Sequence, residues 1–140
     1  MSNPKTSLAQ LRAINEQAAF NRWAGIEVAH ADTGSAELQL AWRAEFGQYA
    51  GFMHAGLVGA LIDTACGFAA VTVAGRVLAS HYSVNCLRPA VGERFIARAR
   101  VVKPGKTQVF TACELYAVQN GEEKLVATGE TLLIPVGDAG

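Results

Sequence analysis

The sequence lacks the features that define several common classes of protein. Its 12 basic and 12 acidic residues leave no net charge, so a basic surface for nucleic acid is not expected. Its three cysteines are odd in number and form no C-x-x-C pair, which argues against a disulfide framework or a structural zinc site. It also has no nucleophile elbow and no H-E-x-x-H motif, the signatures of α/β-hydrolases and of many zinc peptidases.

Charged residues are scarce, at 17%, whereas hydrophobic residues make up 51% of the 140 positions. This length suits one domain with a substantial core, and the low charge favours an oligomer that hides part of its surface. The polar first residues are not followed by the apolar segment of a secretory signal, so reduced cysteines and a cytoplasmic location are expected. We therefore predict a single domain over residues 1–140, with its core at 23–135.

The most informative segment is an apolar run from Ala55 to Gly75, whose only charged residue is Asp63. The run is long enough to span a bilayer, but an acid at the centre of a span costs about 2.5–3.5 kcal/mol. A buried helix, with no membrane association, is the better interpretation, because the amphipathic strands elsewhere need a helix to cover them. An ionised carboxylate in such surroundings is costly unless it is paired or used. His54 stands just before this helix, whose free N–H groups suit an oxyanion.

The remaining periodicities predict one helix and six strands around this central helix. Apolar residues at helical spacing predict a first helix over 8–21, capped by Ser7, and residues 137–140 form a tail. Alternating residues and turn signals, including Asn120-Gly121, predict strands over 25–29, 36–43, 77–88, 94–102, 107–118 and 123–135, with a loop over 44–53. This order indicates an α+β fold in which a curled antiparallel sheet wraps one long helix.

Two motifs in this order are familiar. The first is Phe52-Met53-His54-Ala55-Gly56 followed by Leu61-Ile62-Asp63-Thr64-Ala65, and the second is the strand and turn from Tyr82 to Glu93. They resemble the helix signature and the following strand of the hotdog-fold acyl-CoA thioesterases of the phenylacetate-pathway type. The likeness runs from about Trp23 to Pro135, and it implies a hotdog fold and hydrolysis of small or aromatic acyl-CoA thioesters.

The resemblance also implies roles for the residues at the matching positions. The backbone N–H of Ala55 would polarise the thioester carbonyl, and Gln48 would assist the same carbonyl or the attacking water. Asp63 would act as the general base or as the nucleophile. His54 would brace the loop and the start of the helix, and Gly56 would belong to the substrate-binding turn. No cofactor is implied, since coenzyme A is part of the substrate.

The sequence departs from the family pattern at several of these positions. Ala55 replaces the first glycine of a His-Gly-Gly motif, so the N–H remains but the backbone is less free. A Ser or Thr that some relatives place on the next strand corresponds to Ala79, with Ser80 one residue away. Gly67 stands where other hotdog enzymes have a Thr.

Basic residues near the ends of strands are candidates for the coenzyme A phosphates. These are Arg88, Lys103 and Lys106, although a solvated turn or strand end is the default explanation for each of them.

Helix geometry gives an independent reason to expect two subunits. Ala55 and Asp63 are eight residues apart, or about 12 Å along a helix axis. A carbonyl under attack needs its oxyanion donor and its base-held water each about 3 Å away. One helix cannot provide both, whereas two antiparallel helices related by a two-fold axis can. We therefore predict a homodimer with shared sites, and the resemblance suggests a tetramer made of two dimers.

Other interpretations of these residues stay open at this point. Asp63 alone would suit a structural acid bonded to backbone N–H groups, and Cys66 is better explained as a small buried hydrophobe than as a nucleophile. His30 and His81 fit ordinary strand positions. A zinc site built from His54, Asp63, Cys66 and His81 lacks a recognised spacing. The alternative functions are a hotdog dehydratase or hydratase, and a non-catalytic acyl-CoA-binding module.

Overall fold

The computed structural model describes residues 4–137, so the first three residues and the last three of the expected tail lie outside it. In chain order the elements are α1 (Leu8–Gln17), α2 (Ala19–Ala24), β1 (Glu27–Asp32), β2 (Ser35–Ala41), the short 3-10 helix η1 (Ala44–Phe46), α3 (Ala55–Ala74), β3 (Val77–Cys86), β4 (Arg94–Lys103), β5 (Val109–Gln119) and β6 (Glu122–Pro135).

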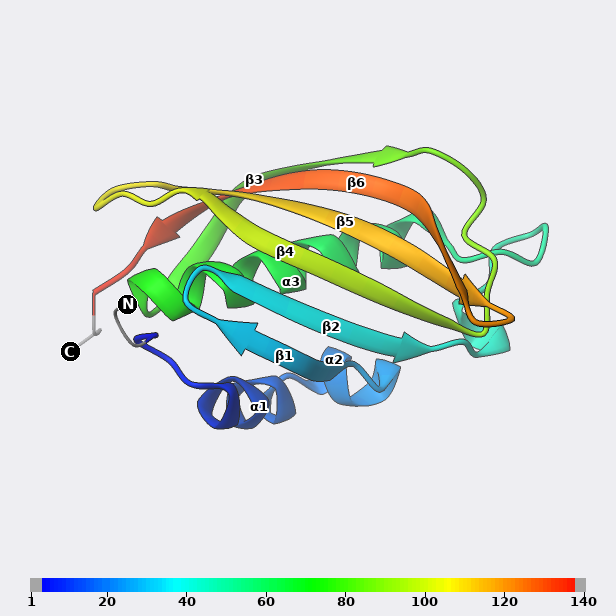
Figure 1. Ribbon diagram of the computed structural model, residues 1–140, viewed down its shortest axis with the longest axis horizontal. Coiled ribbons are helices and arrows are strands. Elements are labelled where there is room, and N and C mark those ends of the chain that lie inside the picture. The colour runs from blue at the N-terminus through cyan, green and yellow to red at the C-terminus, as the bar shows by residue number, and fades with distance from the viewer. Residues whose placement is uncertain (1–3, 138–140) are drawn as a thin grey trace.

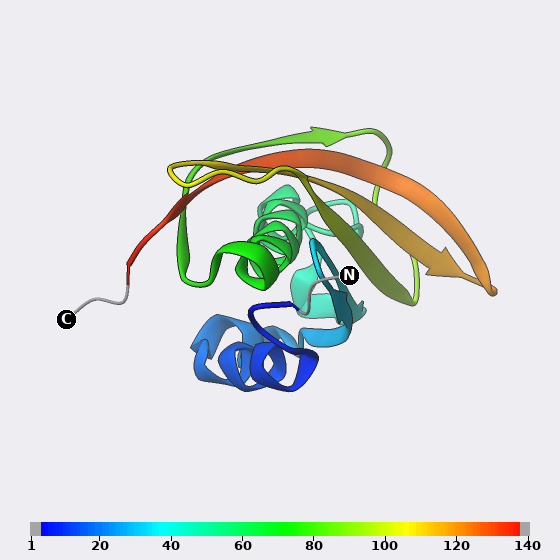
Figure 2. The ribbon, with the colours of Figure 1, turned by 60° about the vertical axis from the view of Figure 1, so that its left-hand side comes forward.

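The six strands form one antiparallel sheet in the order β1-β2-β4-β5-β6-β3. The sheet arches over α3, and α1 and α2 lie on the other side of that helix (Figures 1 and 2). This is the hotdog fold that the sequence predicts. The hairpin signal between β5 and β6 is also confirmed, because Asn120 and Gly121 both adopt positive φ angles, of 52° and 78°.

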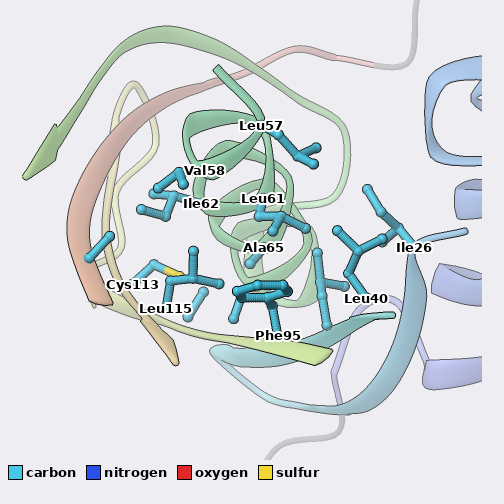
Figure 3. Packing of buried hydrophobic residues seen from close by; sticks show 14 of the residues in the cluster. Ile26, Leu40, Leu57, Val58, Leu61, Ile62, Ala65, Phe95, Cys113 and Leu115 are labelled. Atoms are coloured by element: carbon cyan, nitrogen blue, oxygen red, sulfur yellow. The ribbon is translucent and has the colours of Figure 1, made fainter. Parts of the chain in front are cut away.

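The central helix α3 is the core of the molecule. Its length would suit a membrane span, and so would the mean hydropathy of 1.8 over an 18-residue stretch of it. However, 61% of that stretch is buried inside the fold. Its large apolar side chains meet Phe95, Leu115 and Cys113 from the sheet (Figure 3). The helix is therefore explained by its packing as the core element of the domain.

Glycine at two positions lets α3 lie unusually close to the sheet. A Cβ on Gly129 of β6 would stand 2.6 Å from Ile62 Cγ2 and 2.7 Å from the Ser83 carbonyl oxygen. A Cβ on Gly59 of α3 would stand 3.2 Å from the ring of Tyr82. The contact at Gly129 leaves no room for a side chain and that at Gly59 is tight, so Gly129 in particular sets how closely the helix approaches the sheet.

The expected single helix over 8–21 is wrong, because the chain breaks at Ala18 and resumes as α2. Ala18 has an extended conformation, with φ −87° and ψ 115°. Two buried asparagines hold this break: Asn21 Nδ2 donates to Asn15 Oδ1 at 3.0 Å, and Asn15 Nδ2 donates to the Ile26 carbonyl at 2.8 Å. These bonds tie both short helices to the start of β1, which begins two residues later than the sequence pattern indicates.

Strand β3 forms one edge of the sheet and pairs only with β6. Eight of its ten residues are exposed, and none of the ten is charged. Among the exposed side chains are Leu78, at 64%, and Tyr82, at 49%. An edge that is long, uncharged and partly apolar is a surface on which another strand can pair.

Candidate active site

The first turn of α3 carries one backbone donor that has no partner. The Gly56 N–H donates to His54 Nδ1 at 2.8 Å, and the N–H groups of Leu57 and Val58 donate to the His54 carbonyl at 3.0 and 3.2 Å. The Ala55 N–H has no acceptor within residues 4–137. Since a helix N-terminus also carries partial positive charge, this free N–H suits an oxyanion.

His54 is the N-cap of α3, and its Nδ1 atom performs that task. Its Nδ1 accepts a hydrogen bond, so a neutral ring carries its proton on Nε2. A Cβ on Gly56 would lie only 2.9 Å from that Nδ1 atom. Gly56 therefore allows the imidazole to close over the helix end, and it does not line the cleft described next.

A cleft of about 380 Å³ opens at this end of the helix. It contains three residues that the sequence analysis selected, Gln48, Ala55 and Arg88, which come from a loop, a helix and the segment after β3. We call it the N-terminal cleft. Its other walls are Phe52, Met53, Val58, Cys86, Leu87, Pro89, Ala90, Val126 and Ala127. Arg88 is its only charged residue, so the cleft is apolar with a cationic group in its lining.

Gln48 is held so that its amide nitrogen stays available. Its backbone N–H donates to the Phe52 carbonyl at 2.8 Å, and its side-chain Oε1 accepts from the Ala50 N–H. In the described part of the chain, no acceptor binds the side-chain nitrogen. Gln48 can therefore donate a second hydrogen bond beside Ala55, which is the arrangement needed to polarise a carbonyl oxygen.

Asp63 lies in a different cleft, of about 280 Å³, between α3, β3 and the N-terminal helices. We call this the Asp63 cleft. The side chain is half-buried, and burial raises the pKa of its carboxyl above the ordinary value. Between residues 4 and 137 no hydrogen bond or ion pair reaches the carboxylate, so nothing in the protomer marks it as a structural acid. An unpaired acid with a raised pKa is a candidate proton acceptor.

Within one protomer, the structure does not bring the acid and the donors together. Ala55 and Gln48 line the N-terminal cleft, and Asp63 lines the other. This agrees with the separation of about 12 Å that eight helical residues impose. A single chain therefore holds the acid and the donors in two separate clefts.

Ser80 and Ala79 occupy different surroundings on β3. Ser80 is the extra residue of a β-bulge between Ala79 and His81, and its hydroxyl donates to the Leu132 carbonyl at 3.4 Å. Ala79, not Ser80, lines the Asp63 cleft. The bulge thus places a methyl group, without a hydroxyl, beside the acid.

The cysteine and metal alternatives find no support in the geometry. Cys66 is fully buried and lines neither of the two clefts. Over residues 4–137 no three His, Cys, Asp or Glu side chains are placed to hold a metal ion. Cys66 therefore acts as packing.

The other basic candidates lie away from the N-terminal cleft. Lys106 lines a cavity with Lys5 near the end of α3, and Lys103 lines another with His81. Sequence reasoning also missed Cys86 and Ile14, each of which lines one of the two clefts. No local pattern could have identified them, because their positions depend on which elements pack together.

Comparison with known proteins gives a consistent result. Residues 50–124 match the model of the Thioesterase superfamily. A thioesterase family protein from Silicibacter pomeroyi is 36% identical, with 91% of this chain and 97% of that chain covered and a TM-score of 0.88. The PaaI protein from the phenylacetic acid degradation operon of E. coli is 25% identical, covers 94% of this chain and 97% of its own, and has a TM-score of 0.82.

A more distant structure shows that the fold extends to vertebrates. Zebra fish thioesterase superfamily member 2 is 21% identical, with 94% of this chain and 100% of that chain covered and a TM-score of 0.82. No match was found among curated proteins.

Proposed function

Since the chain belongs to the thioesterase superfamily, we propose that it hydrolyses acyl-CoA thioesters at sites shared by two subunits. The observation that carries this proposal is the pair of half-sites along α3. The free Ala55 N–H lies beside Gln48 in one cleft, and the unpaired Asp63 carboxylate lies in another. The lining of the first cleft lacks an acid that could act as a base, and that of the second lacks these two donors for an oxyanion.

A two-fold dimer brings the half-sites together. If two α3 helices lie antiparallel, the N-terminus of one comes beside the middle of the other, which is where Asp63 lies. The exposed edge of β3 supports this pairing, because Leu78 and Ala79 belong both to that edge and to the Asp63 cleft. We therefore propose a homodimer as the smallest active unit, and two such dimers as the assembled form.

In the proposed reaction, Asp63 of one subunit takes a proton from a water molecule while the water oxygen attacks the thioester carbon. The N–H of Ala55 of the partner subunit and the side chain of Gln48 of the partner subunit stabilise the oxyanion that forms. The carbon–sulfur bond then breaks, and the coenzyme A thiolate leaves and is protonated. In the alternative route an Asp63 oxygen attacks the thioester carbon directly and expels the thiolate, and water then hydrolyses the resulting anhydride. The same two donors stabilise the oxyanion in this route. A thiolate is a good leaving group, so neither route needs a metal or another cofactor.

The substrate class follows from the relatives and from the charges in the clefts. Arg88 gives the N-terminal cleft a cationic group suited to the phosphates of coenzyme A. The similarity to the E. coli PaaI protein, from a phenylacetic acid degradation operon, favours small or aromatic acyl groups.

The decisive experiment measures the loss of thioester absorbance and the release of free coenzyme A by wild type, Asp63→Asn and Asp32→Asn. Asp32 is an exposed acid on β1 that lines neither cleft, so it controls for the chemical change. We expect Asp63→Asn alone to abolish turnover. Equal activity in the two variants would eliminate Asp63 as the acid, and hydration or binding without release of thiol would indicate a hydratase or a binding module.

Complementation between two inactive variants tests the shared site. Asp63→Ala and Gln48→Ala subunits are mixed and allowed to exchange, and mass spectrometry checks that hybrid dimers form. One of the two sites in such a hybrid has both native residues, so part of the activity should return. Hybrids that form but stay inactive would contradict the cross-subunit arrangement.

A further inference from the structure

We infer that the Asp63 cleft is the acyl pocket and that Gly67 and Ile14 set the size of the acyl group it accepts. The inference rests on the proposed function, because the acyl carbon must lie beside Asp63 when water attacks it. It adds which residues determine the substrate preference, and whether a change at each one favours larger or smaller acyl groups.

The lining of the Asp63 cleft suits an uncharged acyl group. Apart from Asp63, none of its residues is charged, and most are aliphatic or aromatic, including Phe68, Val71 and Leu78. The N-terminal cleft, by contrast, contains Arg88. The polyanionic coenzyme A moiety is therefore expected on the Arg88 side, and the apolar acyl moiety on the Asp63 side. A carboxylated acyl group would meet Asp63 with no cation in that lining to offset the repulsion.

Gly67 leaves the floor of this cleft open. It lies four residues after Asp63, so both residues are on the same face of α3. A Cβ placed on Gly67 would meet only Leu133 Cδ2, at 3.8 Å, which is an ordinary contact. The fold therefore does not require glycine here, in contrast to Gly129. The missing side chain instead leaves space beside the acid.

Ile14 forms the opposite wall from α1. It is 40% exposed, so its side chain is not needed to fill the core. The buried pair Asn15 and Asn21 anchors its helix to the start of β1, which makes the wall rigid. This wall lies outside residues 50–124, the part that matches the superfamily model. The catalytic helix and one side of the acyl pocket thus come from different parts of the chain.

The size of the cleft favours a small acyl group. Its volume in the single chain is about 280 Å³, just below the range of about 300–1,000 Å³ for small-molecule pockets, and the partner subunit of the proposed dimer would close its open side. We therefore expect short-chain, branched or single-ring acyl groups to fit, and long fatty acyl chains to be poor substrates.

The test compares kcat/KM over acetyl-, butyryl-, hexanoyl-, octanoyl- and phenylacetyl-CoA in wild type, Gly67→Ala and Ile14→Ala. The added methyl group should lower the ratio for phenylacetyl-CoA over acetyl-CoA about tenfold or more, since one methylene in an apolar pocket is worth about 10–200-fold. Ile14→Ala should shift the preference toward larger acyl groups. Val73→Ile, which enlarges a residue of α3 outside this cleft, should leave the ratio unchanged.

The outcomes separate this inference from the proposed function. Opposite shifts in the two variants support the acyl pocket. Unchanged ratios in both, with hydrolysis that still depends on Asp63, would overturn the pocket assignment and leave the thioesterase proposal intact. If wild type hydrolyses none of the five thioesters, the proposed function fails and the pocket assignment fails with it. Because Ile14 is partly exposed, its variant gives an answer even if Gly67→Ala folds poorly.

Discussion

Two glycine-to-alanine substitutions should have opposite effects on stability, although they add the same methyl group. In Gly129→Ala the new carbon would lie 2.6 Å from Ile62 Cγ2 and 2.7 Å from a backbone oxygen. Carbon atoms pack best at about 3.5–4.0 Å, so helix and sheet must separate by roughly 1 Å. Overpacking of this kind costs about 1–3 kcal/mol. In Gly67→Ala the contact is ordinary, and the gain in helix propensity contributes up to about 1 kcal/mol.

The expected difference between the two variants is therefore about 2–3 kcal/mol. For a domain of this length it corresponds to roughly 10 °C in Tm. The assay is thermal unfolding followed by circular dichroism, at equal subunit concentration so that the proposed assembly affects both variants alike. A Tm for Gly129→Ala equal to or above that of Gly67→Ala would refute the argument that a bare strand backbone sets the helix–sheet distance.

The same substitution should also affect catalysis. Ile62 directly precedes Asp63, so a displacement of α3 at Ile62 also moves the carboxylate. A misplacement of about 1 Å can cost roughly 100-fold in rate. We therefore expect Gly129→Ala to lower kcat at temperatures where the protein remains folded.

Two further predictions follow from burial. Because burial raises the pKa of the Asp63 carboxyl, the folded protein binds this proton more tightly than the unfolded chain, and stability is lost as pH rises between the two pKa values. Asp63→Asn should therefore have a higher Tm than wild type at neutral pH, and the difference should vanish below about pH 3.9. A difference in Tm that is constant at every pH would contradict the raised pKa. The kcat/KM of wild type should fall as acid protonates Asp63. Cys86 is exposed in the N-terminal cleft while the other two thiols are buried, so DTNB should modify one thiol per native subunit and three in denaturant. Desulfo-coenzyme A, which has no thiol to react with DTNB, should slow the native reaction; rapid modification of all three thiols in the native protein would disprove the packing.

The fold could be predicted from sequence because its signals are local. Alternating strands, the Asn120-Gly121 turn and the apolar run around Asp63 each depend on neighbouring residues. The break at Ala18 could not be predicted in this way. It depends on hydrogen bonds from Asn15 and Asn21 that form only when the helices pack against the start of β1.

The candidate site also has features that local sequence predicts and features that depend on packing. The motif containing His54 and Asp63 selected residues of the proposed site, and helix geometry predicted that Ala55 and Asp63 lie apart. The walls of the proposed acyl pocket could not be identified, because Ile14 and Leu78 come to line one cleft only after α1, α3 and β3 have packed. Gly129 was missed for a related reason, since a glycine inside a strand pattern does not reveal which helix residue approaches it.

The uncharged edge of β3 has a consequence for how the protein must be handled. These ten residues include no lysine, proline or acid, so the bulge at Ser80 is left to hinder non-native pairing along the strand. In the proposed dimer a second subunit covers that strand, and before that each newly made chain displays a template for aggregation. Substitutions that weaken assembly should therefore appear first as precipitate during expression, and a clear solution of inactive monomer is the less expected result.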